Sequence, residues 1–487
     1  MPNSMYFVIS VVALILGYVL YGTFVQKVFG ADDKRPTPAK TMADGVDFVE
    51  MPSWRIWLIQ LLNIAGVGPV FGPILGALWG PAALLWIVIG TIFAGAVHDY
   101  FAGMLSIRYQ GANVPDIVGY NLGNIAKQFM RLFSVVLLVL VGVVFVGAPA
   151  GLLSSLFPAD VKASGAIYST KTFWVWIIFA YYFVATIMPI DKIIGRIYPL
   201  FGAVLIFMAV GVSVMLFLNP DISFYNSAEM VNQHPKQLPL YPLVFITIAC
   251  GAISGFHSTQ SPLMARCVAR ESLGKPIFYG SMISEGFIGL VWATVGMSFY
   301  HGSPDLAAAL AGGGPGKIVT DSSIALLGTV GGILAILGVV VLPITSGDTA
   351  FRAARLTIAE VAKYSQRPVP NRLYIAVPVF IIGIFLNNIS FDVIWRYFGW
   401  ANQTLAMIVL WAGAAYLYRR DKFHWICSIP ATFMTAVTIS YICYEPKMGF
   451  NIPIDYSNII GVAIAIVAFV AFMIGGRRCG VGEPENA

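Results

Sequence analysis

A few ionisable side chains lie inside long apolar stretches of this chain. His98 and Asp99 are neighbours in one stretch, and Glu285 lies in another. An ionisable group within a membrane is costly, so such residues are functional candidates by default. An imidazole or a buried carboxyl can accept and release a proton, and we predict that His98, Asp99 and Glu285 couple proton movement to function. A structural alternative stays open for Asp99, which could instead bond Arg108 or the backbone.

Two other apolar stretches are interrupted by clusters of glycine, proline and polar residues. The first cluster covers 63–73 and the second covers 250–262. Proline removes a backbone hydrogen bond, and unpaired backbone at membrane depth occurs where protein or a water-filled cavity surrounds it. We therefore expect two unwound helices that line a binding site. For either one alone, a proline kink satisfied by neighbouring helices is the structural alternative.

The ligand expected between the two interruptions is an organic anion. Each half-helix resumes, near Val70 and near Thr259, with free N–H groups and a positive dipole end that favour a carboxylate. Neither interruption contains Asp or Glu, so we expect no metal site. His257 could touch substrate, relay protons or cap its half-helix. The predicted substrate-binding residues are Gly66, Gly68, Phe71, Gly255, Phe256, His257, Ser258, Thr259 and Gln260.

The elements that must hold these residues are membrane helices. The chain has 487 residues, of which 58% are hydrophobic and 11% charged, whereas a soluble domain carries about 25% charged residues. Apolar runs long enough to cross a bilayer recur throughout. The five cysteines show no metal-ligand spacing and are expected to be packing residues. The predicted spans are 5–28, 54–79, 82–106, 130–156, 172–189, 195–218, 240–266, 276–300, 321–348, 373–390, 393–418, 424–444 and 456–475.

The remaining stretches are short. Only 29–53, 107–129, 219–239 and 349–372 leave room for interfacial helices, so we expect one membrane domain over 1–487. The opening run lacks a basic start and a cleavage motif, which favours a retained span over a signal peptide.

Basic residues indicate the orientation. Of the 29 Lys and Arg residues, 23 fall on the side reached by odd-numbered spans, and the positive-inside rule makes this side cytoplasmic. The N-terminus is then outside and the C-terminus inside. The net charge of +6 fits contact with anionic lipid. We predict no nucleic-acid partner and no obligate protein partner.

The interrupted spans are the second and the seventh, which enter the membrane from opposite sides. This spacing predicts an inverted repeat of five plus five helices, with 54–218 and 240–418 as the two halves. Residues 5–28 and 424–475 are then additions. The fold class expected is an all-α polytopic membrane protein with the LeuT-like architecture.

In LeuT-like sodium symporters, the helix corresponding to span nine supplies hydroxyl oxygens to a bound ion. Its end here carries Thr345 and Ser346, which are ion-site candidates together with the backbone of Ala65 and Gly66. Hydroxyls bonded along their own helix are the alternative. Asp348 and Arg352 stand four residues apart and could form a salt bridge.

Three motifs resemble one known family. They are "GVGPVFGPILGALWGPAALLWIVIGTIFAGAVHDYFAGMLSIRYQGANVPDIVG" from Gly66, "SGFHSTQSP" from Ser254 and "TSGDTAFRAAR" from Thr345. They resemble the carbon starvation protein A (CstA) family, in its shorter bacterial branch. The resemblance implies proton-driven uptake of peptides or pyruvate through the bacterial inner membrane when carbon is scarce. Both substrates carry a carboxylate.

Three classes of function stay open. A secondary symporter is favoured, with H⁺ as coupling ion and Na⁺ as the alternative, acting on peptides, pyruvate or amino acids. A channel is disfavoured because paired interruptions indicate alternating access. An enzyme or a nutrient sensor is disfavoured because the sequence contains no HExxH, GxSxG or P-loop motif and no output domain. No cofactor is expected.

Overall fold

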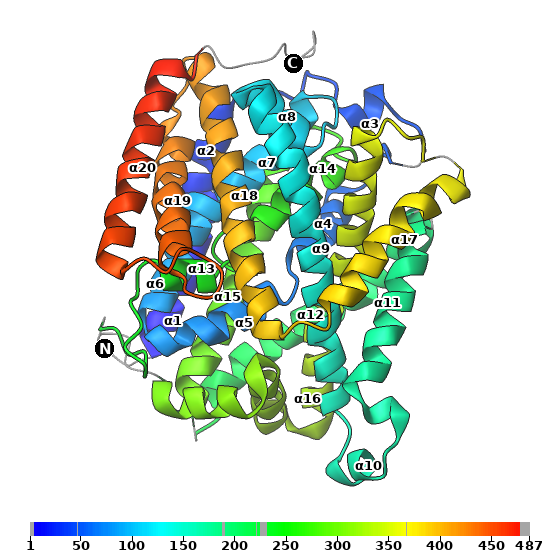
Figure 1. Ribbon diagram of the computed structural model, residues 1–487, viewed down its shortest axis with the longest axis vertical. Coiled ribbons are helices and arrows are strands. Elements are labelled where there is room, and N and C mark those ends of the chain that lie inside the picture. Colours follow the sequence, from blue (N-terminus) through cyan, green and yellow to red (C-terminus); the bar gives the residue numbers. More distant parts are fainter. Residues whose placement is uncertain are drawn as a thin grey trace.

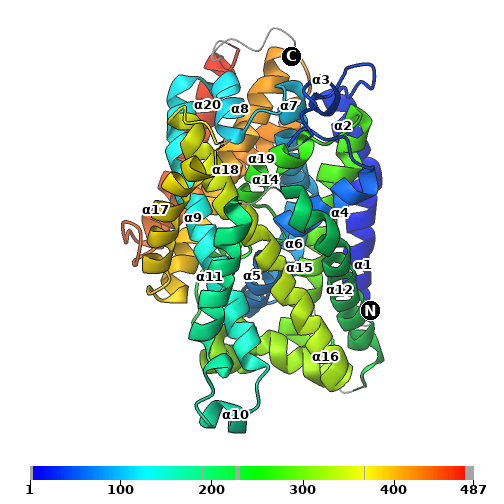
Figure 2. The same cartoon turned by 90° about the vertical axis from the view of Figure 1, so that its right-hand side faces the viewer.

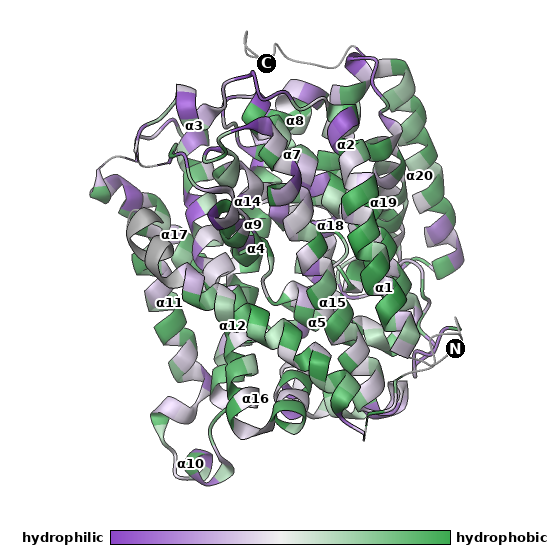
Figure 3. Ribbon diagram, turned by 180° about the vertical axis from the view of Figure 1, so that it is seen from behind, coloured by the Kyte–Doolittle hydropathy of each residue, from purple (hydrophilic) through white to green (hydrophobic). Residues whose placement is uncertain are grey.

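Long helices run between two ends of the molecule in the computed structural model, which describes residues 4–45, 47–187, 190–220, 222–224, 231–366 and 368–477 (Figure 1). The regular structure in these ranges is helical. Cys479 lies outside them, as do residues 188–189 at the end of the predicted span 172–189. Hydrophilic residues gather around α3, α2 and α8 at one end, and the middle of the molecule is largely hydrophobic (Figure 3).

The first half of the chain supplies α1 to α12. Their bounds are α1 Ser4–Leu16, α2 Gly22–Phe29, α3 Pro38–Thr41, α4 Ser53–Ile64, α5 Gly68–Gly76, α6 Ala82–Gly90, α7 Ala96–Arg108, α8 Val114–Leu122, α9 Asn124–Ser155, α10 Ala159–Ala163, α11 Lys171–Ile187 and α12 Ile190–Leu218. Two π turns, Gly17–Tyr21 and Thr91–Gly95, join α1 to α2 and α6 to α7.

The second half supplies α13 to α20. Their bounds are α13 Leu243–Thr247, α14 Gly255–Ala265, α15 Gly280–Phe299, α16 Ser303–Val361, α17 Val369–Leu386, α18 Phe391–Arg419, α19 Trp425–Tyr444 and α20 Ile454–Gly475. A π turn, Lys275–Tyr279, leads directly into α15.

Each of the thirteen predicted spans coincides with a helix or a helix pair. Within the described ranges, nine helices are long and apolar enough to cross a membrane, or ten if the bent pair α4 and α5 counts as one span. The other three coincide with the 17-residue α11, with the pair α13 and α14, and with α18. The count of thirteen therefore stays a prediction. The apolar α1 and α20 leave most of their surface exposed, as helices that face lipid do.

The two interrupted spans lie side by side in opposite directions. Helix α4 packs against α14, and α5 packs against α13. In Figure 1, α4 lies above α5 and α14 lies above α13. The chain therefore runs downward from α4 to α5 and upward from α13 to α14. This antiparallel pairing supports the predicted inverted repeat, although the repeat boundaries stay a prediction.

The structure has a helix, α16, where the sequence predicted a loop before span nine. Helix α16 is one assigned helix of 59 residues, but it turns sharply at Gly313, Gly314 and Gly328. Gly314 and Gly328 have φ of 66° and 69°, a conformation that glycine adopts without the steric cost of a side chain. The parts before Gly328 lie across the lower end of the molecule in Figure 2. Residues 303–320, assigned to a loop by the sequence, are helical on either side of Gly313 and Gly314, where the glycines let the chain fold back.

Contacts at the opposite end tie the N-terminal segment to the turn before α15. Arg108 forms a bidentate ion pair with Glu271, at 2.5 and 2.8 Å, and also donates to the Gly30 carbonyl at 2.9 Å. The backbone N–H and the hydroxyl of Ser272 donate to the Asp33 carboxylate, and these hydrogen bonds lower the pKa of Asp33. An ion pair and hydrogen bonds therefore fix the N-terminal segment to the turn before α15 at this end of the molecule.

Candidate functional site

The first break is short and packed. Helix α4 ends at Ile64, Ala65 leaves the helical conformation with φ −78° and ψ 78°, and α5 starts at Gly68. A proline in the first turn of α5 fits this restart, since its missing N–H would lack a helical partner in any case. A Cβ at Gly66 would lie 2.1 Å from the ring of Phe145, and one at Gly68 would lie 2.3 Å from Cys250. Only glycine allows these approaches.

The second break is longer. Helix α13 ends at Thr247, and α14 resumes at Gly255 rather than near Thr259 as the sequence suggested. The reason is a cap supplied by α18: Asn402 Oδ1 accepts the Phe256 N–H at 2.6 Å. A side-chain oxygen in this position replaces the carbonyl that the missing helical turn would have provided.

Asn402 also holds the unwound segment itself. Its Oδ1 accepts from the Ser254 hydroxyl at 3.2 Å, and its Nδ2 lies 3.0 Å from the same oxygen. A Cβ on Gly255 would lie 2.2 Å from the Asn402 carbonyl oxygen, so α14 and α18 touch through their backbones. The break is thus a defined structure with its own hydrogen bonds.

The π turn between α6 and α7 borders the second break. Thr91 Oγ1 donates to the Gly251 carbonyl at 2.8 Å, and a Cβ on Gly95 would lie 2.2 Å from the carbonyl oxygen of Ala252. π turns inside helices are frequent at functional sites. Here the turn satisfies a carbonyl that unwinding had left without a helical partner.

The predicted proton-coupling residues meet in one buried chain of polar groups. His98 Nδ1 lies 2.8 Å from Asp99 Oδ1, and Asp99 Oδ2 lies 2.9 Å from His257 Nδ1. His257 Nε2 lies 3.1 Å from Glu285 Oε2, although the two are not aligned as a hydrogen bond. All four side chains are fully buried. Glu285 Oε1 in turn accepts the Gly251 N–H at 3.2 Å.

These contacts test the structural alternative for Asp99, in which it would bond Arg108 or the backbone. Arg108 pairs with Glu271, so the alternative in which Asp99 bonds Arg108 is wrong. Asp99 instead bridges two histidines from α7 and α14. His257 contacts both Asp99 and Glu285, and the sequence had left three roles open for it: substrate contact, proton relay or capping of its half-helix.

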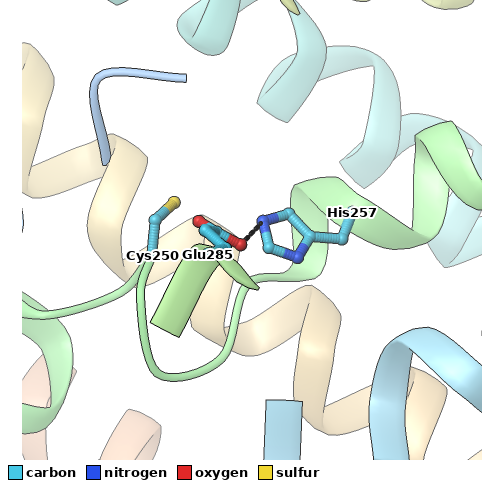
Figure 4. Close-up of side chains that lie close together, drawn as sticks. All are labelled: Cys250, His257 and Glu285. Carbon is cyan, nitrogen blue, oxygen red and sulfur yellow. Dashed lines mark ion pairs between the residues drawn. The ribbon is translucent and has the colours of Figure 1, made fainter. Parts of the chain in front are cut away.

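Cys250 joins the same cluster from the unwound segment (Figure 4). Its Sγ and one ligand atom each of His257 and Glu285 lie within 4.8 Å of one another. The second break contains no carboxylate of its own, but Glu285 reaches it from α15 and supplies one. Cys250 lies beside polar groups rather than in purely apolar packing, accepting a hydrogen bond from Asn402 Nδ2 at 3.7 Å.

The other predicted substrate residues lie on α14, which packs against α4, α9 and α18. Phe256 meets Phe145 edge to face, with ring centroids 5.8 Å apart. Ser258 and Thr259 donate to carbonyls three residues back in α14. Thr259 lines a small cavity between α14, α9 and α16, and the side-chain oxygen of Gln260 is buried without a hydrogen-bond partner.

Phe71, from the first break, faces the start of α18. Its ring centroid lies 6.3 Å from those of Phe391 and Trp395. Trp395 also lines a larger cavity of about 560 Å³ at the lower end of the molecule, which reaches Thr247 at the edge of the second break. Arg396 and Glu445, paired at 2.7 Å, give the wall of this cavity both signs of charge.

Span nine contacts the first broken helix as expected, but one turn before the predicted place in that helix. Thr345 and Ser346 donate to the Leu62 carbonyl at 2.8 and 3.2 Å, rather than lying against Ala65 and Gly66. Both hydroxyls also bond carbonyls in their own helix. Nearby, Asp348 accepts from Tyr181, and Arg352 donates to a carbonyl of α11, so the possible salt bridge between these two described residues does not form.

Sequence comparisons place this chain among known proteins. The sequence model described as "Carbon starvation protein CstA" matches residues 3–158, 150–303 and 299–441. An uncharacterised membrane protein of Haemophilus influenzae is 47% identical over 351 residues, which cover 63% of this chain and 95% of that protein. A Bacillus subtilis protein named "Peptide transporter CstA" is 27% identical, and the match covers 96% of this chain and 94% of that protein.

A further relative carries a different name. The "Pyruvate/proton symporter BtsT" of Escherichia coli is 25% identical over 339 residues, which cover 58% of this chain and 47% of that protein. These named relatives are transporters rather than enzymes.

Solved structures with a similar fold support the architecture. MhsT in complex with L-phenylalanine superposes with a TM-score of 0.56 at 14% identity, covering 87% of this chain and 99% of that one. Mhp1, a nucleobase-cation-symport-1 family transporter, gives a TM-score of 0.53 at 14% identity, covering 88% and 93%. Both have the LeuT fold, and this confirms the predicted fold class.

Proposed function

Because this chain belongs to the carbon starvation protein CstA family, we propose that it is a secondary active transporter that takes up small carboxylate-bearing nutrients by alternating access. The observation that carries this proposal is the contact of two antiparallel broken helices, where Gly68 of one meets Cys250 of the other. Broken helices of this kind form substrate sites in transporters. The family name implies a role in the response to carbon starvation.

Peptides and pyruvate are the proposed substrates. Relatives carry names with each of these two. The proposed contacts are the residues predicted from the two breaks, namely Gly66, Gly68, Phe71 and residues 255–260. In this conformation Phe145 packs against Gly66 and Phe256. Binding would therefore require Phe145 to move aside, which fits a state between two open forms.

The large cavity supports a route to this site. It reaches Thr247, the last residue of α13, from the end of the molecule where α16 begins. The distribution of basic residues assigns this end to the outside of the bacterial inner membrane. Substrate would then arrive through this cavity and leave at the cytoplasmic end.

Coupling to protons is proposed to run through the buried chain His98, Asp99, His257 and Glu285. His98, Asp99 and His257 are joined by hydrogen bonds of 2.8 and 2.9 Å along which a proton can pass. The last link, from His257 Nε2 to Glu285 Oε2 at 3.1 Å, is close enough for transfer once the two groups align. The chain joins α7, α14 and α15. A change in its protonation would therefore act on the broken helix that carries the substrate contacts.

A sodium-coupled amino-acid symporter is the second candidate. It is favoured by Thr345 and Ser346, whose hydroxyls face the Leu62 carbonyl next to the first break. Hydroxyl and carbonyl oxygens are suitable ligands for a hard cation. A sodium ion bound there would replace the two interhelical hydrogen bonds.

Purified protein in liposomes tests these proposals. Counterflow of labelled pyruvate, dialanine and alanine identifies the substrate without any imposed gradient. A pH gradient should then drive uptake that a protonophore abolishes and that does not require sodium. If uptake by the wild-type protein strictly required sodium, and Thr345→Ala lost this sodium-dependent uptake, the second candidate would be established instead. Absence of counterflow for all three solutes would contradict the transport proposal.

One variant pair tests the coupling residues. Glu285→Gln should abolish pH-driven uptake while counterflow persists, because exchange needs no net proton movement. Asp321→Asn is the matched control, since this partly exposed carboxylate pairs with Lys317 on the same helix and lies outside the buried cluster. Full pH-driven uptake by Glu285→Gln would remove Glu285 from the pathway.

A further inference from the structure

Three side chains from different segments bring metal-binding atoms together beside the second break. Cys250 belongs to the unwound segment, His257 to α14 and Glu285 to α15 (Figure 4). One ligand atom of each lies within 4.8 Å of the others, and all three residues are buried. We propose that they form a binding site for one divalent transition-metal ion of the Zn²⁺ class, with Cys250 Sγ, His257 Nε2 and Glu285 Oε2 as ligands.

Two of these atoms lack the hydrogen bonds that buried polar atoms normally make. His257 Nε2 and Glu285 Oε2 face each other at 3.1 Å, and neither makes a hydrogen bond. Most buried polar side-chain atoms are satisfied, so each exception needs a reason. A cation held between the two lone pairs satisfies both atoms at once.

The groups behind the ligands have the arrangement of an outer coordination shell. Asp99 Oδ2 binds His257 Nδ1 at 2.9 Å and so turns Nε2 toward Glu285. A carboxylate behind a ligating histidine is the usual arrangement in zinc sites. The Gly251 N–H fixes the other oxygen of Glu285, at 3.2 Å. Asn402 Nδ2 lies 3.7 Å from Cys250 Sγ, where it can stabilise a thiolate.

The donor set selects the class of ion. Thiolate and imidazole favour Zn²⁺ and similar borderline ions, whereas Mg²⁺ and Ca²⁺ prefer oxygen ligands. Binding displaces the thiol proton of Cys250 to solvent, and the resulting thiolate and the Glu285 carboxylate together neutralise the two charges of the ion. A neutral assembly avoids the large cost of an isolated buried charge.

The spacing needs one adjustment. Metal–ligand distances of roughly 2.0–2.3 Å place tetrahedral ligand atoms about 3.5 Å apart. His257 Nε2 and Glu285 Oε2, at 3.1 Å, are close to this separation. Cys250 stands on non-helical backbone, so rotation of its side chain can bring Sγ closer. Metal and proton are then alternative occupants of His257 and Glu285, and a bound ion would tie the unwound segment to α15.

Metal binding can be measured on the purified full chain in detergent, without transport. Metal-free protein is incubated with Zn²⁺, desalted and analysed for bound metal, and parallel samples with Co²⁺ are read by absorption. We expect about one ion per chain and a cobalt–thiolate absorption band. Cys250→Ser should lose that band, while Cys427→Ser should retain it, because Cys427 is a buried cysteine of α19 outside the cluster.

A positioning role for Asp99 has its own readout. Asp99→Asn should weaken Zn²⁺ binding about 10–100-fold while keeping the cobalt–thiolate band, since all three ligands remain. A wild-type protein that binds no Zn²⁺ above the level of Cys250→Ser, or Co²⁺ bound without a thiolate band, would overturn the proposal. The wild-type measurement decides even if a variant fails to fold. Because these measurements involve no uptake, a failure of the metal-site proposal is distinguishable from a failure of the proposed transport function.

Discussion

The cap that α18 provides to the second broken helix should carry a measurable share of stability. Asn402→Ala removes the oxygen that accepts the Phe256 N–H at 2.6 Å, within a fully buried environment. Leaving a buried donor unsatisfied costs about 1–3 kcal/mol. We expect a loss of about 2 kcal/mol in the free energy of unfolding, measured by titrating purified protein in detergent with dodecyl sulfate and following helix content.

Two variants separate this loss from the volume removed. Asn402→Leu fills a similar volume but offers no acceptor, so it should be as destabilised as Asn402→Ala. Asn388→Ala is the matched control, because this exposed asparagine bonds only its own helix end, and its effect should lie within about 0.5 kcal/mol. Wild-type stability in Asn402→Leu would refute the cap, since packing alone would then explain the alanine variant.

Three further outcomes follow from named contacts. Gly255→Ala places a Cβ 2.2 Å from a backbone oxygen and should cost about 3 kcal/mol of unfolding free energy, whereas Gly151→Ala, with open space around it, should not destabilise. Arg108→Met strands the buried Glu271 carboxylate and should lower the apparent melting temperature in detergent, with a cost of about 3–5 kcal/mol. The hydrogen bonds that lower the pKa of Asp33 stabilise the fold at pH values above the pKa of this residue in the unfolded chain, about 3.9. The free energy of unfolding should therefore fall as the pH drops toward the lower pKa of Asp33 in the folded protein. The fall should be smaller in Asp33→Asn.

Local composition was enough to predict the broken helices. Glycine and proline at 66–73 and 250–262 interrupt apolar runs, and both half-helices restart within about one helical turn of the predicted place. The antiparallel pairing also followed from the number of spans between them. These features depend on neighbours in the sequence, which is why they could be predicted.

The site's hydrogen bonds depend on residues far apart in the chain. Asn402 caps α14 across 146 residues, and His257 reaches Asp99 across 158. Such contacts leave no periodic pattern, so the helix restart was expected at Thr259 instead of Gly255. For the same reason Cys250 was assigned to packing: its approach to Glu285 arises only when α13, α14 and α15 fold together.

The Asn402 cap also sets a condition on how the chain is made. The broken helix α14 leaves the ribosome 146 residues before the side chain that completes it. At about 5–20 residues per second, that interval is roughly 7–30 s. During this time the unwound segment must stay in the translocon, or against water or earlier helices, since lipid offers its free N–H groups no acceptor. Assembly of this half of the protein therefore finishes only after α18 has inserted.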